Sequence, residues 1–185
     1  MDRDQIDELI ALGTSATSIR RIQDLAAREM QRNGLGYTLH NACAATLSCF
    51  MNQAGIPVPV TLGAGRLATR IESLRHWERV DVGGQVAGDV GVTFDTTAPP
   101  GADHVYLVVE RLDADAMYIA DNQAPERHVR YASGHGRTPT RFYLRAPAAV
   151  ESDTFEFLSL GDYPDQDEDT NELAEPFNDD GSPVA

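Results

Sequence analysis

The sequence contains no lysine and only two cysteines, and each scarcity limits what the chain can be. All 15 basic residues are arginines. A GC-rich genome is the simpler explanation, and avoidance of lysine modification in a foreign cell is the alternative. Cys43 and Cys49 fall in one predicted helix, about 9 Å apart along its axis, beyond the roughly 7 Å that a disulfide can bridge. We therefore expect two free thiols, which suits a reducing compartment.

Long apolar runs are also missing. No stretch approaches the ~18–20 apolar residues of a membrane-spanning helix. The first residues, Met1–Asp7, are too acidic for the start of a secretory signal peptide, and no apolar segment of that kind follows. The sequence thus predicts no membrane span. It predicts synthesis in the cytoplasm, with any export left to a dedicated secretion system or a phage lysis route.

The sequence offers little basic surface, and its negative charge is concentrated at the C-terminal end. The formal net charge is −14, and residues 151–185 hold twelve acidic residues and no arginine. The remainder has 17 acids against 15 arginines. Nothing resembles a basic face, so nucleic-acid binding is disfavoured. Residues 161–185 have the composition of a disordered acidic tail, which either aids solubility or docks to a partner such as export machinery or an immunity protein.

Helical patterns come first along the chain, and strand patterns follow. Besides the cysteine-bearing helix, helices are predicted over residues 3–12, from Thr14 or Ser15 to about Asn33, and over Arg66–Leu74. Strands are predicted at Val90–Phe94, His104–Val109, Met117–Ala120, Arg127–Tyr131 and Arg141–Leu144. This order favours an α+β fold in which the helices pack on an antiparallel meander.

The segment Asn41–Gly55 carries the strongest chemical signal. It reads as a helix with Asn41 as N-cap and Gly55 at its C-terminal stop. Cys43 then lies in the first turn, where unpaired N–H groups and the helix dipole favour a thiolate. Cys43 is therefore a candidate nucleophile, with a buried structural thiol as the alternative. Cys49 falls on another side of the helix among apolar residues and is expected to be a core thiol.

A cysteine nucleophile needs a base, and His104 is the preferred candidate among five histidines. It begins an apolar strand, where the sheet would hold it rigidly while it still reaches solvent. His40 precedes the helix and is poorly held, and His76 sits at a helix end. His128 belongs to an arginine-rich edge strand, and His135 to a glycine-flanked loop.

The base also needs an orienting partner, which the next strand supplies. Asp121, Asn122 and Gln123 follow that strand, and antiparallel pairing returns them to the His104 end of the sheet. A Cys43–His104–Asp121 or Cys43–His104–Asn122 arrangement is therefore expected. No Cys/His pair has metal-ligand spacing and no phosphate-binding glycine loop is present, so neither a metal nor a cofactor is expected.

Several short motifs, in order, resemble those of the papain-like cell-wall hydrolases, the NlpC-type peptidases and CHAP amidases. They span roughly residues 22–145. The matching positions are Gly36-Tyr37, Cys43, Gln53-Ala54-Gly55-Ile56-Pro57, Trp77–Val80, Gly88-Asp89-Val90, His104-Val105 and Asp121–Gln123. The family's usual Asp-Cys-Ser-Gly is here Ala42-Cys43-Ala44-Ala45, and Asp103 replaces the glycine that precedes the family histidine.

The resemblance implies a papain-like domain at residues 22–150, after a helical extension at 1–21 and before the acidic tail at 151–185. It implies a cysteine peptidase or amidase that cuts amide bonds in peptidoglycan. Cys43 would be the nucleophile, His104 the base and Asp121 or Asn122 the orienting residue. The oxyanion would bind the Cys43 backbone N–H, and Tyr37 and Gln123 are candidates for contacting the oxyanion or the substrate.

Two alternatives remain open from the sequence. The same residues would serve an effector or toxin that cleaves or acylates a host protein. A catalytically inactive papain-like module that binds a partner, with the acidic tail as its interaction element, belongs to a different class.

Overall fold

The computed structural model describes residues 1–38, 41–94 and 102–148, with the side chains of Phe94, Ala102 and Asp103 excepted. The predicted acidic tail, His40 and the loop over 95–101 lie outside this description. Residues Met1–Ala149 group into one compact unit. None of the helices within the described ranges is long and apolar enough to cross a membrane.

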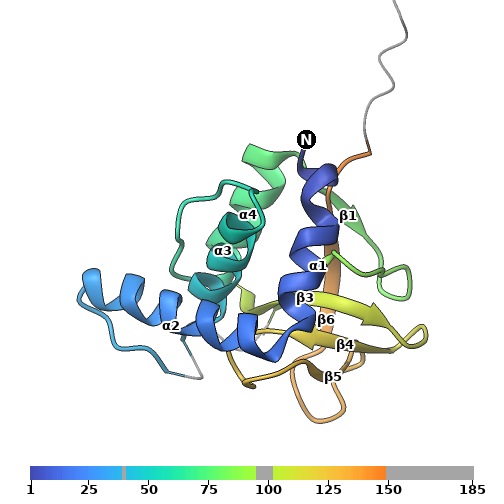
Figure 1. Cartoon of the computed structure of the whole chain (residues 1–185). Helices are drawn as coiled ribbons and strands as arrows, with labels where there is room; N and C mark the ends of the chain where they lie inside the picture. The colour runs from blue at the N-terminus through green and yellow to red at the C-terminus, as the bar shows by residue number, and fades with distance from the viewer. Residues whose placement is uncertain (39–40, 95–101, 149–185) are drawn as a thin grey trace, which may run out of the picture. The chain divides into compact units, whose positions relative to one another are not determined.

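The described part of the chain is α+β, with four α-helices and a six-stranded antiparallel sheet (Figure 1). The 3-10 helix Asp2–Gln5 precedes α1 (Ile6–Thr14), α2 (Ala16–Arg32), α3 (Cys43–Gln53) and α4 (Ala64–Arg75). The strands are β1 (Glu78–Val80), β2 (Val90–Phe94), β3 (Ala102–Arg111), β4 (Ala116–Ala120), β5 (His128–Tyr131) and β6 (Thr140–Arg145). The predicted α+β class is confirmed at this level.

The N-terminal helices belong to the compact unit and are not a separate extension. Helix α2 runs across the expected boundary at residue 21, with Ser15 as its N-cap. Leu9 of α1 and Ile19 of α2 are fully buried. Gly13 lies so close to Val109 of β3 that a side chain would not fit there. The expectation of an extension over 1–21 is thus corrected, because these helices bury apolar faces in the common core.

The sheet is a meander only in part. Strands β2 to β5 are neighbours in sequence order, but β6 returns across the sheet to lie between β1 and β2. Arg145 holds this position, donating from Nε and Nη2 to the buried carboxylate of Asp89 at 2.9 and 2.7 Å. Strand β1 was not predicted. It has only three residues, and it pairs with β6, where the partner of its middle residue Arg79 is Leu144, 65 residues further along the chain.

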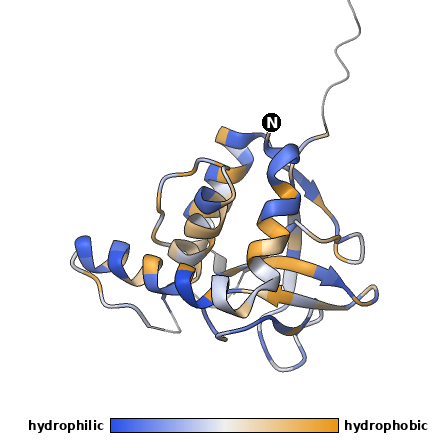
Figure 2. Cartoon of the chain, viewed as in Figure 1, coloured by the Kyte–Doolittle hydropathy of each residue, from blue (hydrophilic) through white to orange (hydrophobic). Residues whose placement is uncertain are grey.

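The two faces of the sheet carry different side chains of β3. Val105 and Leu107 point into the large core with α1, α3 and α4, the helices that lie along one face in Figure 1. Tyr106 and Val108 enter a smaller cluster on the other face. Helix α3 is central, since every residue from Cys43 to Met51 is buried. On α2, in contrast, Figure 2 shows hydrophobic positions between hydrophilic ones, as expected for a helix that buries one face.

Substituting Gly91 with alanine should destabilise the fold by about 1–3 kcal/mol, because overpacking forces neighbouring side chains from their positions. A Cβ at Gly91 would overlap the ring of Tyr106, its partner across β2 and β3. Urea unfolding would measure the change. The control is Gly36→Ala, where a Cβ meets no atom within 4 Å. Equal losses in both variants would contradict this packing argument.

Candidate active site

Cys43 is the first residue of α3 and lies at the positive end of the helix dipole. The N-cap is Ala42, and no side chain caps this end of the helix. Asn41, the expected N-cap, lies one residue too early. Its Oδ1 accepts from the Thr38 N–H at 2.9 Å, and its Nδ2 donates to the Gly36 carbonyl at 3.0 Å. The Asn41 side chain therefore closes the turn that leads into the helix and does not cap it.

His104 lies near the start of β3. At this point the pairing of β2 is irregular with both of its neighbours, β3 and β6. His104 is opposite Thr93, and the register shifts on the β3 side between Thr93 and Phe94. The Thr93 hydroxyl donates to the His104 carbonyl at 3.3 Å, which fixes the backbone there. Such bulges re-aim side chains and are frequent beside functional sites. His104 and Cys43 are 8% and 6% exposed, so the site is nearly closed to solvent.

Asp121 follows β4 and holds the imidazole of His104 from the hairpin partner strand. Its Oδ2 lies 2.9 Å from His104 Nε2. Its Oδ1 accepts from the Gln123 N–H at 2.7 Å. Of the two predicted candidates, Asp121 thus makes the contact with the His104 imidazole that was expected of an orienting residue. The Asn122 side chain instead donates to the Thr38 carbonyl at 3.4 Å.

The site favours an imidazolium at His104. Burial by itself would lower the pKa of His104, but hydrogen bonds with Asp121 and Cys43, and the negative charge of both, raise it to about 9. Since Nε2 is engaged by Asp121, Nδ1 is the nitrogen left to exchange a proton with the Cys43 thiol. An imidazolium beside a thiol stabilises the thiolate, which is the nucleophilic form.

Asp121 remains ionised although it is only 3% exposed. Burial raises its pKa, but hydrogen bonds from His104 and His128 outweigh burial and hold the pKa well below the usual range. The carboxylate therefore carries the negative charge that keeps His104 protonated.

His128 of β5 is a site residue that the sequence reasoning missed. Its Nε2 lies 3.1 Å from Asp121 Oδ1, so that one carboxylate is shared by two histidines. The contact depends on β5 pairing with β4, where His128 is opposite Ile119. The sequence does show a histidine in an edge strand soon after Asp121. The register of β4 and β5 is what brings the His128 side chain to the Asp121 carboxylate.

The other predicted residues lie in various surroundings. The Tyr37 hydroxyl is buried near Cys43; burial, and the negative charges of Asp121, Asp24 and Cys43, raise its pKa, while the Thr46 hydroxyl lowers it. The Tyr37 and Thr46 hydroxyls fall short of hydrogen-bond geometry with each other. The Gln123 side chain accepts from Arg137 Nη1 at 3.3 Å and points to the neighbouring loop. His76 is the C-cap of α4, and His135 lies in the loop after β5, away from Cys43.

Gln23 of α2 holds the turn that carries Asp121. Its Nε2 donates to the carbonyls of Asp121 and Ala124, at 2.9 and 2.7 Å. Both carbonyls lie about a hundred residues further along the chain, so this contact was not readable from the sequence. The helix that packs beside α3 thereby also fixes the position of the orienting carboxylate.

Gln23→Glu should therefore cost about 1–3 kcal/mol, because the partly buried carbonyls of Asp121 and Ala124 lose their donor and face a carboxylate instead. The chain offers a matched control in Gln31→Glu, an exposed position on the same helix. Thermal unfolding of the two variants would compare the losses. A Gln31 variant as unstable as the Gln23 variant would show that added charge, and not the lost donor, causes the effect.

Cys49 differs from Cys43 in its surroundings. It is 2% exposed and packs in the main core, as expected for a core thiol. Burial, and next the charge of Glu29, raise its pKa to about 11. Both cysteines are free thiols. At neutral pH Cys49 is thus a protonated, enclosed thiol.

The cluster of His104, Asp121 and His128 has no metal-binding geometry. Within the described ranges, no group of three or more histidine, cysteine or acidic side chains could hold a metal ion. The two Nε2 atoms face separate oxygens of one carboxylate, so they do not converge on a common point. The three side chains form a hydrogen-bonded cluster.

Comparison with known proteins assigns no family to this arrangement. No protein-family model matches the chain, and no curated protein matches it. The functional assignment therefore depends on the geometry of Cys43, His104 and Asp121.

Proposed function

We propose that the chain is a cysteine peptidase or amidase with a papain-like arrangement of Cys43, His104 and Asp121. The observation that carries the proposal is that His104 hydrogen-bonds with both Cys43 and Asp121 in a nearly closed site. A nucleophile, a base and an acid that orients the base are the three parts that thiol hydrolysis requires.

In the proposed reaction the Cys43 thiolate attacks an amide carbonyl, and a C–S bond forms. The tetrahedral intermediate collapses as the C–N bond breaks, and the His104 imidazolium gives its proton to the leaving amine. Neutral His104 then takes a proton from water, which attacks the thioester. The second tetrahedral intermediate collapses as the C–S bond breaks, the acid product leaves, and the thiolate–imidazolium pair is restored. Asp121 keeps the ring oriented and stabilises its positive charge throughout.

The oxyanion would form next to the N-terminus of α3, where backbone N–H groups and the helix dipole favour negative charge. Tyr37 is a second donor in this proposal. Its raised pKa, caused first by burial, keeps the hydroxyl protonated and able to donate. The hydroxyl is buried and has no hydrogen-bond partner among the described residues, so it is available to a ligand.

Peptidoglycan is the proposed substrate, following the resemblance of the sequence motifs to cell-wall hydrolases. Action on a host protein is the alternative for the same three residues. Export by a secretion system or a phage lysis route belongs to this proposal, as does docking of a partner through residues 151–185.

Incubation of the full chain with purified muropeptides tests the substrate. We expect a new amine and a new carboxyl terminus by mass spectrometry, and no product with Cys43→Ala. Intact muropeptides together with a reactive Cys43 would overturn the cell-wall assignment and favour a protein substrate. Intact muropeptides with an unreactive Cys43 would favour an inactive binding module.

A further inference from the structure

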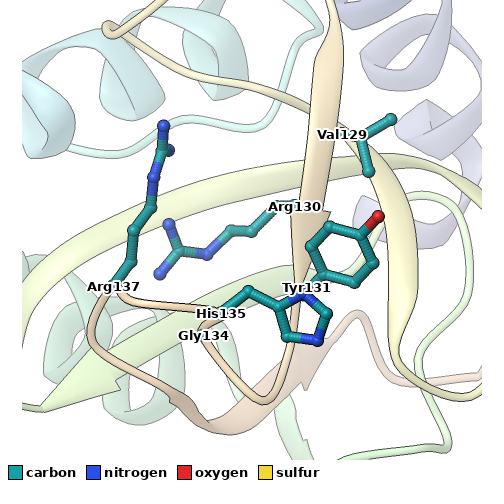
Figure 3. A pocket seen from close by; sticks show the side chains of 6 residues that line it. All are labelled: Val129, Arg130, Tyr131, Gly134, His135 and Arg137. Atoms are coloured by element: carbon teal, nitrogen blue, oxygen red, sulfur yellow. The ribbon is translucent and has the colours of Figure 1, made fainter.

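A small pocket that is not lined by Cys43, His104 or Asp121 lies between the end of β5 and the loop that leads to β6 (Figure 3). Its volume is about 190 Å³. The lining residues are Val129, Arg130, Tyr131, Gly134, His135 and Arg137. In Figure 3 the side chains of Arg130 and Arg137 extend toward the same side of the loop, while His135 stacks on Tyr131 with ring centroids 4.1 Å apart.

The pocket is positively charged although the chain has a net charge of −14. Three of its six lining residues are basic or can become so, and none is acidic. One of the lining residues has an acidic neighbour, since His135 Nε2 lies 3.8 Å from the Asp115 carboxylate. Among the described residues Asp115 forms no ion pair with Arg130 or Arg137.

Arg130 is the residue that makes this pocket unusual. It is only 4% exposed, and its Nε–H has no hydrogen-bond partner among the described residues. Its Nη2 donates to the Thr138 carbonyl at 2.9 Å, and its guanidinium lies 4.8 Å from the centre of the Tyr106 ring. Within the described ranges no carboxylate forms an ion pair with Arg130. A buried cation with an unsatisfied donor is costly unless an anion completes its surroundings.

The ligand chemistry follows from the two guanidinium groups. Planar guanidinium donors match the paired oxygens of a carboxylate or phosphate group. The pocket is smaller than the roughly 300–1,000 Å³ typical of sites for drug-sized molecules. It therefore suits one anionic group, carried by a ligand whose remainder stays outside.

The pocket is also connected to the candidate active site. The Tyr106 ring lies between the two, since it contacts Arg130 on the pocket side and stacks with His104 at a centroid distance of 6.0 Å. Arg137 donates to the side chain of Gln123, two residues after Asp121. A ligand held at the arginines would lie beside the residues that orient His104.

We propose that Arg130 and Arg137 form a binding site for the carboxylate or phosphate group of a small anionic ligand. The site binds without bond making or breaking, and it does not depend on the thiol chemistry of Cys43. Failure of either proposal therefore leaves the other standing.

Calorimetric titration of the full chain at fixed ionic strength tests the site, with inorganic phosphate and N-acetylglycine as separate probes. Saturable binding is expected, and the probe that binds more tightly identifies the anion. Arg137→Gln and Arg130→Gln should each weaken binding at least tenfold. Arg66→Gln is the matched control, since it removes one exposed arginine from α4, which packs on the other face of the sheet; it should change binding less than twofold.

Two results would overturn the proposal. One is the absence of saturable binding of both probes to the unmodified chain. The other is equal binding by the Arg137 and Arg66 variants. Because Arg137 is exposed, its variant is expected to fold even if the loss of buried Arg130 disturbs the structure.

Discussion

Replacing Cys43 with alanine should reduce the proposed amide hydrolysis by about 10⁴-fold or more, because the nucleophile is lost. His104→Ala should cost a similar factor, since the same proton transfers fail. The double variant should be no worse than either single variant, because the two residues act as one unit. Chromatography of the products released from muropeptides measures the activity of all three variants.

Cys49→Ala is the matched control for this experiment. It removes the same thiol from the same helix, six residues further along, but from the core. We expect normal activity per folded molecule and a modest loss of stability from the small cavity. Full activity of the Cys43 variant, or an inactive but folded Cys49 variant, would reverse the roles assigned to the two thiols.

Asp121→Asn should lower activity by about 10²–10⁴-fold, as expected when the acid that orients a catalytic histidine becomes an amide. The amide removes the negative charge that holds His104 as imidazolium, and it offers one oxygen where the carboxylate offers two. The pKa of His104 should therefore fall from about 9 in the unmodified chain. NMR titration of the imidazole nitrogens measures this shift directly.

The sign of the pH effect follows from the same contact. His104 is protonated below about pH 9, and the imidazolium needed by the leaving amine is lost as the pH rises through that value. The alkaline limit of activity should thus lie near pH 9 and move to lower pH in Asp121→Asn. An unchanged His104 titration in the variant would show that Asp121 does not control the base.

His128→Ala tests whether activity depends on the orientation of His104 by Asp121 alone or on the whole cluster of His104, Asp121 and His128. It removes one of two partners of Asp121 Oδ1, the other being the Gln123 N–H, and leaves the 2.9 Å contact between Oδ2 and His104 in place. We expect less than about a tenfold loss of activity, since the charge beside His104 remains. A loss as large as that of Asp121→Asn would make His128 an essential part of the cluster.

The sequence predicted those parts of the site that depend on local pattern and nearest-neighbour pairing. The first-turn position of Cys43 follows from the helix pattern, and the meeting of His104 with Asp121 follows from one hairpin. Ser15 as a helix cap and Gly55 after α3 are likewise local features, and both occur in the structure. Asn41 was wrong as an N-cap because its side chain has a competing partner in the preceding turn.

The remaining features depend on contacts between segments far apart in the chain. His128 reaches Asp121 only through the register of β4 and β5, and Gln23 reaches the same turn from α2. The insertion of β6 beside β2 is stabilised by Arg145 and Asp89, 56 residues apart. The pocket lined by Arg130 and Arg137 is formed by an edge strand and a loop. The sequence pattern within these segments does not determine how they lie relative to each other.

Competitive labelling of the two thiols tests the central claim most directly. The native chain would be treated with limiting iodoacetamide at neutral pH, and mass spectrometry would follow Cys43 and Cys49 separately. Both are nearly buried, so exposure alone does not distinguish them, at 6% and 2%. We expect Cys43 to be modified much faster than Cys49, and His104→Ala to remove most of this difference. Equal rates for the two thiols would show that Cys43 is not an activated nucleophile.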